Sequence, residues 1–371
     1  MSGGGALHPA LLAPSFFPEV RRGGERIVRE LADELVAGDH RPRLITSHPG
    51  RPSRALEDGL EVVRNWRPPG SRLRRREFED HLTHVPFSYL SLRRGDADLA
   101  HAFYPTDALA ATRWARAAGR PSILTHMGVP HRRGIATRRL RAEVLTRVVR
   151  EADAVTVLSR TAADAMRRWV GAEARVIHPG VNLDAFTPGG TRAEEPTVAC
   201  LADPAAENKR VPLLVEAFLR LRRDRPDARL LLMRPDDPLL AARLGAPDGV
   251  ELVAPGWRPD DVAEVYRRAW VTALPSWGES FGIVLAESLA CGTPVVGSDR
   301  GAIPEVVGGD EAVGRLFEGE SPESLASALR EALELAEDPA TAAACRARAE
   351  RFSTRRMGEE YLALYRELLD A

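Results

Sequence analysis

Two successive series of short apolar runs alternate with amphipathic stretches of helical period along this chain. The first series includes the runs Ala10–Ala13, Leu99–Phe103 and Ala154–Leu158, and the second begins at Thr197–Leu201. Strands that alternate with helices of 10–15 residues are typical of parallel sheets covered on both faces. Two such series predict an α/β chain of two doubly wound, Rossmann-like domains that face a cleft.

The remaining expected elements follow the same alternation. The other strands are Arg43–Thr46, Leu60–Arg64, Ser122–His126, Arg175–Ile177, Arg229–Met233, Gly249–Val253, Val271–Leu274 and Pro294–Gly297. The helices are Glu25–Val36, Asp107–Ala118, Ile135–Glu151, Thr161–Trp169, Val211–Arg223, Pro259–Ala269, Phe281–Ala290, Pro322–Ala336, Thr341–Arg351 and Thr354–Leu369.

A polar stretch rich in proline and glycine separates the two series. It contains Pro188, Gly189, Gly190 and Pro196, residues that interrupt helices and strands. We place the linker at 188–196 and expect three parts: a domain over residues 1–190, a domain over 191–352, and a C-terminal helix over 353–371 that packs back across the junction. A chain of 371 residues is long enough for about two domains.

Composition excludes several classes of protein. No apolar run approaches the roughly 20 residues of a membrane span, and residues 1–18 lack the basic start of a signal peptide. The three cysteines, Cys200, Cys291 and Cys345, fit no disulfide framework and no zinc spacing, which indicates a reducing cytoplasm. No paired histidines suggest a metal helix, and neither the dinucleotide-binding glycine pattern nor a Walker phosphate loop is present.

The charged residues are distributed unevenly. Residues 1–185 carry a formal charge of +9 and residues 186–371 a charge of −10. The first half therefore either faces something anionic or has a solvated basic surface. Of the 52 basic residues, 51 are arginine and only Lys209 is lysine. A compact ammonium differs from a planar guanidinium, so we expect a chemical reason for lysine at this position.

The segment over 274–307 carries the clearest chemical signal. A strand ends at Pro275, a glycine-containing loop follows, and a helix is expected to start near Ser280–Phe281, where free backbone N–H groups can bind an anion. Glu279 precedes this helix start, and Glu287 lies roughly 12 Å further along the axis. One ligand with hydroxyls at both ends and phosphates between them, a nucleotide sugar, suits this arrangement. The alternative, favoured by spacing alone, is a helix cap at Glu279 and a surface helix residue at Glu287.

The segment over 249–307 resembles the donor-binding half of the retaining glycosyltransferases of family 4, which have the GT-B fold. The family's pair of glutamates, eight positions apart, falls on Glu279 and Glu287, and the string Ala-Cys-Gly-Thr-Pro-Val-Val follows at 290–296. The resemblance covers nearly the whole chain, more loosely in the first half. Its other matches are Ala13–Phe17, Gly23–Gly24–Glu25, His126, Ser159, Ile177–Val181 and Lys209–Phe218.

The resemblance implies a role for each matched residue. Lys209 is expected to contact the donor phosphates, Glu279 the hydroxyls of the donor sugar, and Glu287 the ribose diol. Backbone N–H groups of Gly24, Phe281 and Gly282 would also meet the phosphates. His126 would touch the sugar or the acceptor; alternatively, it is a satisfied polar residue at a strand end.

In one respect the chain departs from the family pattern. A family arginine usually lies about six residues before the lysine, where this chain has Asp203. Arg210 stands where glycine is usual, and it could supply the missing positive charge to the donor.

The resemblance implies a retaining, metal-independent transfer of a hexosyl unit from a nucleotide sugar to a hydroxyl acceptor. The sequence does not distinguish UDP from GDP, and we favour UDP. The leaving phosphate would help to deprotonate the acceptor, so we assign no general base, and we expect no cofactor, no metal and no nucleic-acid partner. A phosphorylase would need a second lysine for pyridoxal phosphate. The remaining alternative is a degenerate GT-B module that binds a sugar nucleotide or a partner without turnover.

The acceptor is not defined by the sequence. Arginines cluster in the first half at positions 72, 74, 75 and 76, and at 132, 133, 138, 139 and 141. They suit a phosphorylated or lipid-linked acceptor, with peripheral contact at the inner face of a membrane, or they form solvated helix faces. A neutral or cationic acceptor, such as an aminocyclitol, would instead need carboxylates in the cleft. We expect a cytoplasmic protein and leave peripheral membrane contact open.

Overall fold

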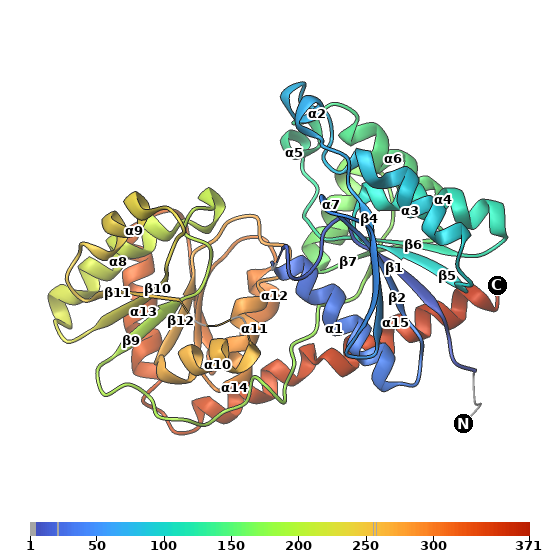
Figure 1. Ribbon diagram of the computed structural model, residues 1–371. Helices are drawn as coiled ribbons and strands as arrows, with labels where there is room; N and C mark the ends of the chain where they lie inside the picture. Colours follow the sequence, from blue (N-terminus) through green and yellow to red (C-terminus); the bar gives the residue numbers. More distant parts are fainter. Residues whose placement is uncertain (1–4, 21, 255, 257) are drawn as a thin grey trace. The chain divides into compact units, whose positions relative to one another are not determined.

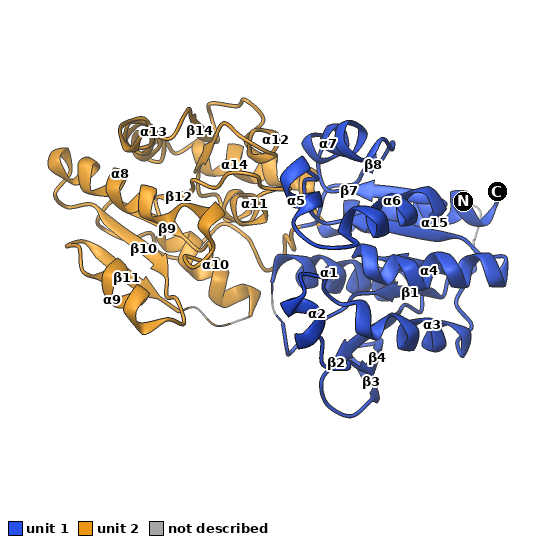
Figure 2. Cartoon of the chain, turned by 90° about the horizontal axis from the view of Figure 1, so that it is seen from above, with its two compact units in different colours: residues 1–180, 354–371 blue, residues 181–353 orange. Residues whose placement is uncertain are grey.

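The computed structural model describes residues 5–20, 22–254, 256 and 258–371. The chain divides into two compact units, coloured separately in Figure 2: Met1–Gly180 with Thr354–Ala371 form unit 1, and Val181–Ser353 form unit 2. The division at residues 180 and 181 precedes the linker expected at 188–196. The C-terminal segment belongs to unit 1.

Unit 1 contains an eight-stranded sheet in the order β3-β4-β2-β1-β5-β6-β7-β8 (Figure 1). All pairings are parallel except that of β3 with β4. The strands are β1 (Pro9–Leu12), β2 (Arg43–His48), β3 (Ser53–Glu57), β4 (Leu60–Trp66), β5 (Leu99–Ala102), β6 (Ser122–His126), β7 (Ala154–Val157) and β8 (Arg175–Val176). The helices are α1 (Gly23–Ala37), α2 (Ser71–Arg75), η1 (Leu82–His84), α3 (Val85–Arg93), α4 (Pro105–Ala118), α5 (Arg132–Ala136), α6 (Arg141–Glu151), α7 (Arg160–Val170) and α15 (Thr354–Leu369).

Unit 2 contains a six-stranded parallel sheet in the order β11-β10-β9-β12-β13-β14. The strands are β9 (Thr197–Cys200), β10 (Arg229–Met233), β11 (Val250–Val253), β12 (Val271–Leu274), β13 (Val295–Ser298) and β14 (Gly314–Phe317). The helices are η2 (Glu207–Lys209), α8 (Val211–Asp224), α9 (Pro238–Gly245), α10 (Pro259–Arg268), α11 (Ile283–Ala290), α12 (Ile303–Val307), α13 (Pro322–Leu335), α14 (Thr341–Ala349) and η3 (Glu350–Phe352).

Each sheet has a point at which the strand order changes direction. In unit 1 the order runs outward from β1 to β2 on one side and from β5 to β6 on the other; in unit 2 the corresponding pair is β9 and β12. Right-handed crossovers then place successive helices on opposite faces, which buries both faces of the central strands. Every residue of β1, β5, β9 and β12 is accordingly buried. Ligands of doubly wound folds bind at such points, beyond the carboxyl ends of the strands.

Helix α15 is fastened to the sheet of unit 1 by buried polar contacts as well as by packing. His101 of β5 lies 2.7 Å from the hydroxyl of Tyr365 through Nδ1 and 2.6 Å from Thr125 Oγ1 through Nε2. The hydroxyl of Tyr361 lies 3.0 Å from Thr125 Oγ1. Because all four side chains are buried, these contacts satisfy groups that would otherwise be costly to remove from water.

The structure corrects several expected helix bounds. The single helix expected over Ile135–Glu151 is two helices, α5 and α6, because Leu140 between them has a left-handed backbone with φ of 67°. The helix expected from Phe281 begins at Ile283. No helix of the described residues is both long enough and apolar enough to span a membrane.

Candidate functional site

The loop after β12 leads into a helix start with free backbone N–H groups. Gly282 caps α11 with φ of 99°, a conformation that favours glycine, and no side chain caps this end. An uncapped helix start can bind an anion through its N–H groups and its dipole. Phe281 offers only its backbone, because its ring is buried and packs edge-on against Phe352 at 5.1 Å.

Lys209 and Glu279 form an ion pair between Nζ and Oε1. Lys209 ends η2 in the loop after β9, and Glu279 lies in the loop after β12. The two residues therefore meet across the point where the strand order of unit 2 changes direction. Their side chains are 25% and 11% exposed, so both remain reachable from solvent.

Backbone contacts hold this pair in place. The N–H of Trp277 donates to the carbonyl of Asn208 at 3.0 Å, which ties the two loops together. The N–H of Ala302 donates to the carbonyl of Glu279 at 3.1 Å. Gly301, with φ of 63°, lies so close that a Cβ there would come within 2.9 Å of the same carbonyl oxygen. The position of Glu279 is thus fixed by its main chain.

Glu287 lies on the buried side of α11. Only 1% of it is exposed, and the hydroxyl of Tyr266, from α10, donates to its Oε2 at 3.1 Å. The alternative in which Glu287 is a solvated surface residue is therefore wrong. A buried carboxylate needs such hydrogen bonds, since an unpartnered charge in the interior is costly. Its contact with ribose remains a prediction.

Arg210 follows Lys209 and caps α8 in a left-handed conformation, with φ of 54°. This explains why glycine suits the position, because a side chain is strained there. Its Nη1 is buried and lacks a hydrogen-bond partner among the described residues. Burial lowers the pKa of Arg210, Glu320 raises it, and Arg300 lowers it further. The guanidinium thus retains a donor that an anion could use.

Asp203 occupies the place of the family arginine without taking over its chemistry. Its exposed side chain accepts a hydrogen bond from the N–H of Ala205 at 2.9 Å and so shapes the turn after β9. A turn-forming carboxylate cannot donate to a phosphate. Positive charge near this loop comes instead from Lys209 and Arg210.

The two expected residues of unit 1 lie at the carboxyl edge of its sheet. Gly24 is the second residue of α1, and a Cβ there would come within 3.1 Å of the hydroxyl of Tyr104. His126 ends β6, and its Nδ1 lies 2.9 Å from the carbonyl oxygen of Gly128. Burial lowers the pKa of His126, and the contact with Gly128 raises it. Both the ligand-binding interpretation and the satisfied strand-end interpretation of His126 stay open.

Three residues near these sites were not identified from the sequence. Tyr266 supports Glu287, whereas Glu25 and Tyr104 lie beside Gly24. Glu25 falls within the matched glycine loop, and Tyr104 follows the run Leu99–Phe103. Both residues come soon after the end of an expected strand, and this placement could have indicated them. Tyr266 has no comparable signal, because its partner lies 21 residues away in another helix.

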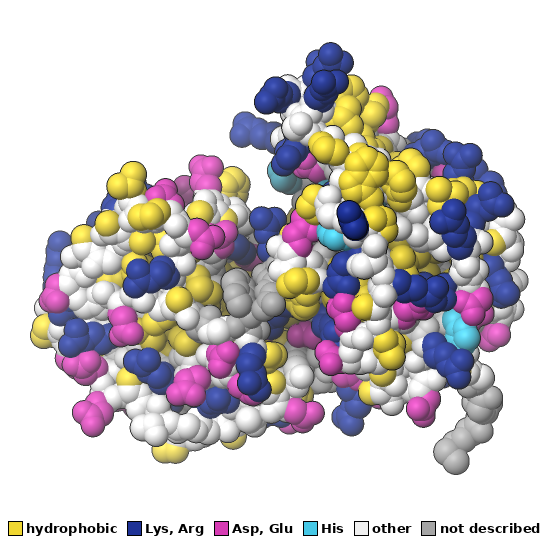
Figure 3. All heavy atoms as spheres, in the orientation of Figure 1, with side chains coloured by type: hydrophobic (Ala, Val, Ile, Leu, Met, Phe, Trp, Pro, Cys, Tyr) yellow, Lys and Arg dark blue, Asp and Glu magenta, His cyan; other side chains and the backbone are white. Residues whose placement is uncertain are grey.

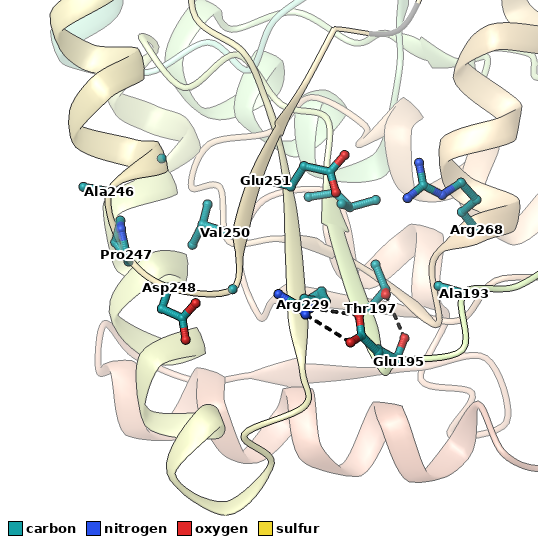
Figure 4. A pocket seen from close by; sticks show the side chains of 13 residues that line it. Ala193, Glu195, Thr197, Arg229, Ala246, Pro247, Asp248, Val250, Glu251 and Arg268 are labelled. Atoms are coloured by element: carbon teal, nitrogen blue, oxygen red, sulfur yellow. Dashed lines mark hydrogen bonds and ion pairs between the residues drawn. The ribbon is translucent and has the colours of Figure 1, made fainter.

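A hollow of about 580 Å³ lies elsewhere in unit 2 (Figure 4). It is lined by Thr197, Arg229 and Val250, the first residues of β9, β10 and β11. It therefore lies at the amino edge of the sheet, opposite the loops that carry Lys209 and Glu279. Arg229 is occupied by two hydrogen bonds to the carboxylate of Glu195, so we place the site at the carboxyl edge instead.

The sequence of this chain is similar to those of known proteins. Residues 21–185 match the model of Glycosyltransferase Family 4, and residues 195–335 match that of Glycosyl transferases group 1. The D-inositol 3-phosphate glycosyltransferase of Mycobacteroides abscessus is 38% identical over 208 residues, which cover 50% of this chain and 45% of that protein. The chain thus spans about half the length of the curated relatives it matches.

Solved structures share the fold over almost the whole chain. Sucrose-phosphate synthase from Thermosynechococcus elongatus aligns with a TM-score of 0.81 and 22% identity, covering 98% of this chain and 99% of that one. Anabaena HepE in complex with UDP-glucose aligns with a TM-score of 0.74 and 17% identity, covering 98% and 100%. With both halves matched by family models and the overall fold shared with these neighbours, the chain belongs to the glycosyltransferases of family 4 and has the GT-B fold.

Proposed function

We propose that this protein transfers a hexosyl unit from a nucleotide sugar to a hydroxyl acceptor. The observation that carries the proposal is the ion pair of Lys209 and Glu279 beside the uncapped start of α11. One ligand can place its phosphates on the ammonium and the helix N–H groups, and a sugar hydroxyl on the carboxylate. An arrangement that binds phosphate and sugar side by side suits a sugar nucleotide.

The chemistry separates charge at the bond between the sugar and the diphosphate. As the bond from C1 to the phosphate oxygen breaks, negative charge develops on the diphosphate, and positive groups aimed there lower the barrier. Lys209, the N–H groups at Ile283 and Val284, and the guanidinium of Arg210 take this role. The acceptor oxygen then bonds to C1, and its proton passes to an oxygen of the leaving phosphate.

We further propose that the transfer retains the configuration at C1 and needs no metal. Attack from the face that the phosphate leaves would let the leaving oxygen accept the acceptor's proton, so no general base is required from the protein. Side-chain and helix charges would perform the stabilisation that a divalent cation performs in other sites.

We propose UDP as the nucleotide of the donor. The ribose diol would then donate to Glu287 in place of the hydroxyl of Tyr266. Support comes from the fold neighbour whose solved complex is described as containing UDP-glucose. A carboxylate offers two acceptor oxygens, which match two adjacent hydroxyls.

The arginine clusters of unit 1 differ in part of their surroundings, because Arg132, Arg133 and Arg139 of the second cluster are exposed like the first cluster, whereas two of its members form ion pairs. Arg141 and Arg138 pair with Glu79 and Asp80 and so hold the segment before η1. The arginines of the first cluster are exposed and without an ion pair among the described residues: Arg72, Arg74, Arg75 and Arg76. Figure 3 shows basic side chains gathered over α2. We propose this surface, rather than the second cluster, for any contact with an anionic lipid headgroup or surface.

A binding module without turnover is the second candidate function. Asp203 at the place of the family arginine favours it, because one phosphate contact is lost. The tests are thermal shifts with a panel of UDP-, GDP- and ADP-sugars, followed by nucleotide release with and without acceptors. A ligand at 100 times its dissociation constant stabilises a protein by about 2.7 kcal/mol. A shift without nucleotide release would favour the binding module, and no shift with any sugar nucleotide would contradict both.

A further inference from the structure

Unit 1 has its own point of reversal between β1 and β5, and acidic groups gather beyond the ends of these two strands. Ser15 follows β1, and its hydroxyl donates to Glu25 Oε1 at 3.0 Å. Tyr104 follows β5, and Asp107 lies in the first turn of α4. The same relation to the strand order places Lys209 and Glu279 in unit 2.

Two carboxylate oxygens in this cluster lack partners. Glu25 is 3% exposed and Asp107 is fully buried. Among the described residues, no hydrogen-bond donor reaches Glu25 Oε2 or Asp107 Oδ2, although Asp107 Oδ1 lies 2.9 Å from His84 Nε2. Buried oxygens of this kind require a donor, which a water molecule or a ligand can supply.

Tyr104 lies close enough to Glu25 and Asp107 for their charges to act on its hydroxyl. It is partly exposed, and its hydroxyl makes no hydrogen bond within the described residues. Burial raises the pKa of Tyr104, and the charges of Glu25 and Asp107 raise it further, while Arg22 lowers it. The hydroxyl therefore stays protonated and borders a region of negative potential. Gly24, without a side chain, leaves the approach beside that hydroxyl open.

We propose that Glu25 and Tyr104 form a recognition site for an unphosphorylated, polyhydroxylated acceptor, neutral or carrying an amino group. Hydroxyl or ammonium donors would satisfy the carboxylate oxygen, and the Tyr104 hydroxyl would donate to a ring or hydroxyl oxygen. An acceptor phosphate placed beside Glu25 Oε2 would face a carboxylate, and like charges in a partly buried site repel. The donor phosphates, which the resemblance places at the N–H of Gly24, would have to lie away from that oxygen. The inference rests on the proposed glycosyl transfer and names the substrate class of its acceptor.

The experiment compares matched acceptors with and without charge. Glucose, glucosamine and glucose 6-phosphate form one set, and myo-inositol, an aminodeoxy-inositol and an inositol phosphate form another. Binding is measured by titration calorimetry on the full chain with UDP present, and transfer is measured with UDP-sugars. We expect a neutral or amino member to bind at least tenfold more tightly than its phosphorylated counterpart.

Two variants test whether Glu25 and Tyr104 recognise the acceptor. Glu25→Gln keeps an oxygen that can accept from Ser15, but it replaces the unpartnered oxygen with an NH2 donor. We therefore expect the acceptor KM to rise about tenfold or more, with the largest rise for the amino acceptors. The change in kcat should be smaller. Tyr104→Phe should raise the KM for every acceptor in both sets without changing the order in which the acceptors are preferred. Asp33 lies on the exposed side of α1 and pairs with Arg29. Asp33→Asn is therefore the matched control, and it should change neither the acceptor KM nor kcat.

Tighter binding of phosphorylated members, failure of every neutral and amino member to bind at millimolar concentration, or unchanged acceptor affinity in Glu25→Gln would overturn the inference. Donor binding separates this from the proposed function. Absence of binding of any sugar nucleotide to the wild type would refute glycosyl transfer. A donor-induced rise in Tm that persists in Glu25→Gln while acceptor affinity falls supports both proposals.

Discussion

At the scale of single residues, the one lysine among 52 basic residues forms the ion pair of the candidate site with Glu279. Lys209 must fit between the turn after β9 and the carboxylate of Glu279, where a compact ammonium can turn between partners. We predict that Lys209→Ala lowers kcat on the order of 10²–10³-fold, because a contact aimed at leaving-group charge is lost. Nucleotide-release kinetics and the unfolding midpoint measure this; near wild-type kcat would refute the assignment.

The two glutamates are expected to separate binding from catalysis. Glu279→Ala should lower kcat, since contacts to the sugar change as its ring flattens, whereas Glu287→Ala should mainly raise the donor KM. Because the hydroxyl of Tyr266 donates to Glu287, Tyr266→Phe, which removes that hydrogen bond and keeps the ring, is the control for loss of this contact. Identical kinetic profiles for the two alanine variants would show that the division of roles is wrong.

Arg210 combines a strained left-handed backbone with a positively charged side chain. We predict that Arg210→Gly preserves or raises Tm, because glycine accepts the left-handed conformation that costs other residues roughly 1–2 kcal/mol. The donor KM should rise about tenfold, since a charge-assisted hydrogen bond is lost. Thermal melting and steady-state kinetics measure the two effects. A lower Tm with unchanged donor KM would assign Arg210 to structure alone.

At the scale of elements, α15 depends on a neutral histidine. Burial lowers the pKa of His101 to about 3, from 6.5 in the unfolded chain. The unfolded state therefore binds more protons between these values, so stability is full above pH 6.5 and falls as the pH drops, by up to about 1.4 kcal/mol per unit.

We predict that His101→Gln, which keeps polar contacts and does not titrate, makes the fall in Tm between pH 7 and pH 5 shallower than in the wild type. Other histidines with lowered pKa, including His40 and His126, contribute equally to both proteins. Parallel curves for the two proteins would show that His101 does not govern the docking of α15.

At the scale of the whole molecule, the alternation of strands and helices was sufficient to predict the α/β class and the two parallel sheets. It did not identify β3, β14, α2, α3, α9 or α12, which are short or carry exposed faces, so their periodicity is weak. The division of the helix at Leu140 depends on one left-handed backbone, for which leucine gives no signal.

The candidate site was predictable only in part. The resemblance located Lys209 and Glu279, but their ion pair follows from two loops that meet at the carboxyl edge, which no sequence spacing shows. The burial of Glu287 depends on Tyr266 of another helix. The unpartnered oxygens of Glu25 and Asp107 likewise emerge only when β1 and β5 become neighbours.

The most direct test of the central claim is NMR analysis of the products formed from an α-linked UDP-sugar and the preferred acceptor. We expect UDP and glycoside in equal amounts, with the new bond also in the α configuration. A β-linked product would contradict retention, and the absence of any glycoside with a donor and acceptor that both bind would contradict glycosyl transfer.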